Sequence, residues 1–115
     1  MTGTKEAEIS LGVLRIADAQ IDGRATFKNL RHEIPNFVDL DAADLAISRT
    51  PDGEPMWHQI VRNIQSHHAT DGNFIRMGYL KHIPKIGYEI TDAGRRFLRA
   101  RGFRNDEPFS LTRTI

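Results

Sequence analysis

The feature that most constrains this sequence is a pair of short apolar runs joined by a tight turn. The runs are YLKHI and YEI, and the four residues between them are Pro-Lys-Ile-Gly, at 84–87. Pro84 suits the second position of a type I turn, and Gly87 supplies the left-handed residue that commonly follows in short hairpin loops. Because an isolated two-stranded hairpin is only marginally stable in water, it must pack against helices.

Three helical segments are expected before residue 50. KEAEISLGVLRIADAQIDG has apolar residues at helical spacing and stops near Gly23. In ATFKNLRHEIP, Thr26 is expected to cap a second helix, and Pro35 lies just past its end. DLDAADLAIS predicts a short third helix capped by Asp39 or Asp41, and RTPDGEP is a turn-rich loop.

The helix expected from about Pro55 to His68 is the most informative segment. Proline suits its first turn. At 100° per residue its apolar residues form one stripe, with His68 at the edge, and its polar residues gather opposite. The stripe is Trp57, Ile60, Val61 and Ile64, and the polar face is Gln59, Arg62, Asn63 and Ser66. These polar types reach base edges and phosphates, although an ordinary solvated helix face has the same appearance.

A last helix follows the hairpin, with Thr91 as its cap and Asp92 in its first turn. Phe97 and Leu98 are expected to pack inward. We therefore predict a mainly α chain with a small two-stranded antiparallel hairpin, a winged helix-turn-helix, over 1–102. Residues 103–115 show no clear period and form a C-terminal arm or tail.

Length and composition indicate a single small domain and exclude disulfide-bonded and membrane-spanning classes of protein. The chain has 115 residues, enough for one compact domain, and it has no Cys, which excludes disulfides and thiolate zinc sites. No apolar run approaches the roughly 18 residues of a membrane-spanning helix. The N-terminus reads MTGTKEAEIS and lacks the pattern of a signal peptide, so a cytoplasmic protein without a membrane partner is expected.

Charge is distributed unevenly along the chain. Residues 1–61 carry 6 Lys/Arg against 10 Asp/Glu, a net charge of −4, whereas residues 62–115 carry 10 against 5, a net charge of +5. This asymmetry indicates one basic face, and an anionic partner and a merely solvated face explain it about equally well.

Double-stranded DNA is the expected partner. The polar face named above would enter the major groove, while Lys81 and Lys85 on the hairpin and Arg76 nearby would hold phosphates. His67 at the helix end would touch phosphate, and Arg49 and Arg95 would extend the backbone contact. The alternative is a winged helix used for protein interaction or dimerisation, because the fold does not fix the partner.

Residues from about Ile9 to Arg101 resemble the N-terminal winged-helix domain of Mrr-type restriction endonucleases. The matching stretches are RTPDGEPMWHQIVRN, GYL and IPKIGYEITDAGRRFL, in that order. The resemblance implies DNA binding in front of a nuclease domain, in a restriction or modification-sensing system. Two features depart from the family pattern: SHHATDGN interrupts the recognition helix, and no nuclease constellation follows, so the chain is either a standalone protein or a fragment. A second copy or a partner nuclease is a further expected partner.

Catalytic and metal chemistry are not expected. The adjacent His67 and His68 point about 100° apart on a helix, and no HExxH spacing occurs. The serines have no nucleophile-elbow context, and the glycines are too scattered to cradle a nucleotide phosphate. We therefore expect a chain that is not an enzyme and that uses no metal or cofactor.

Overall fold

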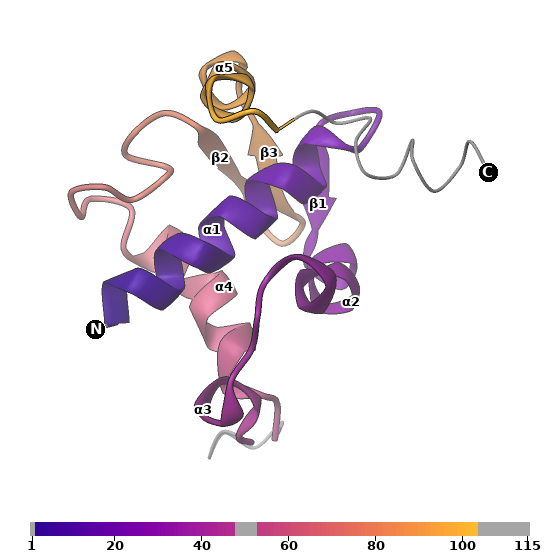
Figure 1. The fold of residues 1–115 in the computed structure, drawn as a ribbon, viewed down its shortest axis with the longest axis vertical. Helices are drawn as coiled ribbons and strands as arrows, with labels where there is room; N and C mark the ends of the chain where they lie inside the picture. Colours follow the sequence, from indigo (N-terminus) through magenta and orange to yellow (C-terminus); the bar gives the residue numbers. More distant parts are fainter. Residues whose placement is uncertain (1, 48–52, 104–115) are drawn as a thin grey trace.

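The computed structural model describes residues 2–47 and 53–103, with side chains from residue 5 onward. About half of the chain is helical, and a small three-stranded antiparallel sheet completes the fold (Figure 1). The expectation for Arg49 lies outside the described residues, and so does the predicted arm, 103–115, apart from Phe103. Within the described ranges, no helix is long and apolar enough to cross a membrane.

Helix α1, Thr2–Asp18, is the central element of the core. It crosses the middle of the molecule, and α2, α4, α5 and the sheet pack around it (Figure 1). Ile9, Val13 and Ile16 are buried, which confirms the apolar stripe read from the sequence. Gly23 follows with a φ of 72°, a left-handed conformation that glycine adopts without a Cβ clash.

The sheet has three strands rather than the two that we predicted. Strand β1, Arg24–Thr26, pairs with β3, Gly87–Ile90, which also pairs with β2, Leu80–Ile83, so the order is β1-β3-β2. A Cβ on Gly87 would lie only 2.0 Å from the carbonyl oxygen of Ala25. The absence of a side chain at Gly87 therefore allows β1 to approach β3.

The hairpin turn also differs from the prediction. The N–H of Ile86 donates to the carbonyl of Ile83 over 3.0 Å, with Pro84 at the second position as expected. The third position, Lys85, has a φ of 68°, which matches a type II turn and not a type I turn. The left-handed residue of this turn is thus Lys85.

Side-chain caps start three of the remaining helices. Thr26 caps α2, Phe27–Phe37, and Thr91 caps α5, Asp92–Ala100, as predicted. Asp41 caps the short α3, Ala42–Leu45, through a capping box with Asp44. Pro35 lies inside α2 and not past it: the N–H that proline lacks costs a helix little in its last turn, so α2 continues to Phe37.

Helix α4, Met56–Ser66, lies between α1 and α3 and begins directly after Pro55. Trp57, Val61 and Ile64 are buried against the core. The helix ends earlier than expected because the chain turns after Ser66. His68, placed at the edge of the core from the helical period, is therefore exposed.

Candidate functional site

The outer face of α4 contains the four polar residues that the sequence placed together. Arg62 and Ser66 are exposed, whereas Gln59 and Asn63 are half-buried. The opposite face of the helix packs on α1 and on the sheet, where the Tyr88 hydroxyl donates to the carbonyl of Val61 over 2.6 Å. Burial raises the pKa of Tyr88 to about 12, so this hydroxyl keeps its proton at neutral pH.

A carboxylate that we did not single out from the sequence organises this face. Glu54, two residues before α4, accepts two hydrogen bonds from the Arg62 fork, at 3.1 Å and 2.5 Å. Nδ1 of His58 lies 3.2 Å from the same carboxylate. Hydrogen bonds from Arg62 are the main cause that lowers the pKa of Glu54, so it is ionised at neutral pH. The side chain of Arg62 thus has a defined position on the surface.

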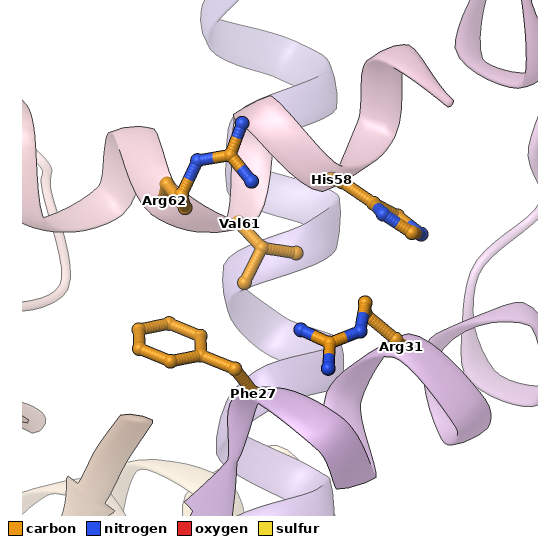
Figure 2. Close-up of a pocket in the computed structure, with 5 residues that line it drawn as sticks. All are labelled: Phe27, Arg31, His58, Val61 and Arg62. Carbon is orange, nitrogen blue, oxygen red and sulfur yellow. The ribbon is translucent and has the colours of Figure 1, made fainter. Parts of the chain in front are cut away.

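A cleft separates α4 from α2 beside this cluster. Its volume is about 130 Å³, and Figure 2 shows five side chains around it: Phe27, Arg31, His58, Val61 and Arg62. Arg31 and Lys28 are exposed on α2, and the sequence analysis gave them no role. Two basic residues three positions apart lie on one helix face, which could have indicated an anion-binding surface. The net negative charge of residues 1–61 concealed this pair.

The hairpin tip lies beside the first turn of α2. The N–H of Phe27 donates to the carbonyl of Ile86 over 2.8 Å. Lys85 is exposed at the tip, next to this contact. The described structure therefore brings the α4 face, the α2–α4 cleft and Lys85 into neighbouring positions.

Lys81 points away from this surface. It is paired in register with Glu89, which also accepts a 3.0 Å hydrogen bond from Arg24. Since side chains alternate between the faces of a strand, these three residues lie on the sheet face opposite Tyr88 and α4.

Three further predicted residues contact carboxylates. Arg95 donates to the buried carboxylate of Asp18 over 2.6 Å, and Arg99 donates to the same carboxylate over 2.8 Å. Nδ1 of His67 lies 2.8 Å from Glu6 of α1. The exposed Arg76 lies 3.2 Å from Asp71. Arg95 thus ties α5 to α1, at the end of the molecule away from α3 (Figure 1).

Among the described residues, no group of three or more His, Asp or Glu side chains is arranged to hold a metal ion. No family model, no curated protein and no solved structure matches this chain.

Proposed function

We propose that the chain is a winged-helix domain that binds double-stranded DNA. In this proposal α4 enters the major groove and the β2–β3 turn contacts the phosphate backbone. The order of elements supports the assignment, because the helices α2 and α4 are followed by a hairpin whose strand β3 lies between β1 and β2.

The observation that carries the proposal is the position of the hairpin tip beside α2. The Phe27–Ile86 hydrogen bond places Lys85 near the same end of α2 that faces α4. A duplex seated on α4 would then meet cations from three elements: Arg62, Arg31 and Lys85. Lys28 adds a fourth positive charge on α2, whereas Lys81 and Arg95 stay outside the proposed surface.

The residues differ in their proposed roles. Arg62 is held by Glu54 on the outer face of α4, with Gln59, Asn63 and Ser66 around it. Its planar fork matches the two acceptors of a guanine edge once the pair with Glu54 opens. Lys85 carries a flexible ammonium that follows a phosphate without reading sequence.

Two alanine substitutions test these roles by fluorescence anisotropy on a panel of duplexes. Arg62→Ala should weaken binding to the preferred site by about 1–3 kcal/mol and flatten the preference among sites. Lys85→Ala should weaken binding to every duplex and reduce the salt slope by about one. Arg96→Ala is the control, since it removes the same charge from the exposed face of α5. Equal losses from all three variants would contradict the proposed surface.

We extend the proposal to a restriction or modification-sensing system on the basis of the sequence resemblance alone. Unmodified, methylated and hydroxymethylated duplexes of one sequence provide the test. Equal affinity for all three duplexes would contradict a modification-sensing role without contradicting DNA binding.

A second candidate function is dimerisation or protein interaction through the α3–α4 end. Leu45, Ile47 and Met56 are exposed there, and Ile47 forms an isolated bridge with Pro55. Such exposed apolar groups mark interaction sites when they are contiguous. Sedimentation at increasing concentration should show a dimer that Ile47→Asp dissociates if this candidate is correct. A monomer at every concentration, together with unchanged duplex binding, would leave only the DNA proposal.

A further inference from the structure

The cleft between α2 and α4 is lined by apolar and cationic side chains, and its volume suits one planar ring rather than a whole nucleotide. Its volume is about 130 Å³, and its walls come from two helices that are both fixed to the core (Figure 2). Val61 and the ring of Phe27 give it an apolar floor. Arg31 and Arg62 stand on opposite helices at its edge, and His58 closes one end.

The apolar wall is rigid before any ligand arrives. The Phe27 ring packs edge-on against the buried Tyr88, with centroids 5.8 Å apart and planes at 80°. The Tyr88 hydroxyl in turn donates to the carbonyl of Val61. Both apolar groups of the cleft are therefore held by the same buried tyrosine, and a planar ring binds to such a wall with little cost in ordering.

The edge of the cleft is cationic. Within the described residues, no carboxylate forms an ion pair with Arg31, whereas Arg62 shares its charge with Glu54. Arg31 therefore contributes a positive charge beside the apolar floor. An anionic group on the ligand, such as a phosphate, would pair with Arg31.

His58 adds a directional polar group. Its Nδ1 lies 3.2 Å from Glu54, and an ionised carboxylate only accepts hydrogen bonds, so Nδ1 carries the proton. In the neutral ring Nε2 is then an acceptor. The edge-on contact with Trp57, at 4.3 Å between centroids, fixes the ring orientation. This acceptor matches the exocyclic amino group of adenine or cytosine.

We propose that the α2–α4 cleft binds a single nucleotide, with its base against Phe27 and Val61 and its phosphate on Arg31. The nucleotide comes either from free solution or from the bound DNA, as an unstacked residue. Binding of an unstacked DNA residue rests on the proposed function, whereas binding of a free nucleotide does not.

The free-nucleotide arm uses the full-length chain in an NMR titration with AMP, CMP and inorganic phosphate. The expected result is saturable binding of AMP or CMP that shifts the amide signals of Phe27, Arg31 and Val61. Arg31→Ala should weaken this binding about tenfold, because it removes a charged hydrogen bond. Arg96→Ala, which removes the same charge from the exposed face of α5, is the matched control and should change binding less than about twofold. Inorganic phosphate that binds as tightly as the nucleotides would overturn the role of the base.

The DNA arm uses a duplex with 2-aminopurine next to a mismatched adenine, compared with the fully paired duplex, because 2-aminopurine fluorescence rises when the neighbouring base leaves the stack. At protein concentrations that saturate the duplex, fluorescence that rises with the wild type, but not with Arg31→Ala, would identify an unstacked base of the DNA as the ligand. Saturable mononucleotide binding without this rise would identify the free nucleotide.

If neither arm gives a signal while the paired duplex binds normally, the cleft proposal is wrong and the DNA proposal survives. If nucleotides bind but no duplex does, the cleft proposal survives and the DNA proposal is wrong.

Discussion

The three-stranded sheet depends on the absence of a side chain at Gly87. In Gly87→Ala the new Cβ would lie 2.0 Å from the Ala25 carbonyl oxygen and 2.9 Å from the Cα of Thr26. Both atoms belong to the backbone, so no side-chain rotation relieves the clash. Strand β1 must therefore move away from β3.

The magnitude follows from the contacts that such a movement breaks. Alternate register pairs of an antiparallel ladder exchange two hydrogen bonds, so the Ala25–Tyr88 pair contributes two, and the N–H of Ile90 donates a third to the carbonyl of Gly23 over 2.9 Å. Each lost backbone hydrogen bond costs about 1 kcal/mol. The neighbouring bond from Phe27 to Ile86 would weaken as well. We expect the free energy of unfolding to fall by about 3–4 kcal/mol, a large fraction of the stability of a small domain.

Gly78→Ala is the matched control. Gly78 also has a positive φ, 85°, but a Cβ there would meet nothing within 4 Å. It should cost only the left-handed strain of roughly 1–2 kcal/mol. Urea denaturation followed by circular dichroism measures both variants, and equal losses would refute the argument that Gly87 allows close strand approach.

Three further predictions concern charges and strain. Asp18→Asn removes the buried carboxylate that holds Arg95 and Arg99, and should lower the free energy of unfolding by about 2–3 kcal/mol, since both arginines are about one-third exposed. The exposed Arg96→Ala should change it by less than about 0.5 kcal/mol in the same denaturation series. The pKa of Glu54 is lowered in the folded chain, so its ionised form stabilises the fold above the ordinary pKa of 4.5 and this contribution is lost as the pH falls through the lowered value. Glu54→Gln should therefore be less stable than the wild type at pH 7, and this difference should shrink as the pH falls below 4.5; a constant difference would contradict the sign. Lys85→Gly removes left-handed strain and should raise the free energy of unfolding by about 1 kcal/mol while weakening duplex binding, and a loss of stability would contradict the observed φ of 68°.

Local signals in the sequence predicted the helices and their caps. The stripe of α1, the two faces of α4 and the caps at Thr26 and Thr91 depend on residues within one or two turns of each other. Strand β1, Arg24–Thr26, is too short to show an alternating pattern, and it forms because it pairs with β3, whose residues lie more than 60 positions further along the chain. Pro35 was misplaced because the rule that proline ends a helix is weakest in the last turn.

The candidate site was less accessible to sequence reasoning because it combines distant segments. Glu54 belongs to a loop, and only the folded loop shows that it holds Arg62. Arg31 belongs to the acidic half of the chain, and its place beside α4 follows from the packing of two helices on α1. Conversely, Lys81 matched the charge pattern, but strand alternation places it on the other face of the sheet.

The most direct test of the central claim is the affinity of the whole chain for duplex DNA as a function of salt. If α4, α2 and the hairpin tip together contact about four phosphates, the logarithm of the binding constant should fall against the logarithm of salt with a slope of roughly −3 to −4. Affinity should then drop about a hundredfold between roughly 50 and 200 mM salt. No binding to any duplex at about 50 mM salt, or an affinity that does not change with salt, would contradict the account.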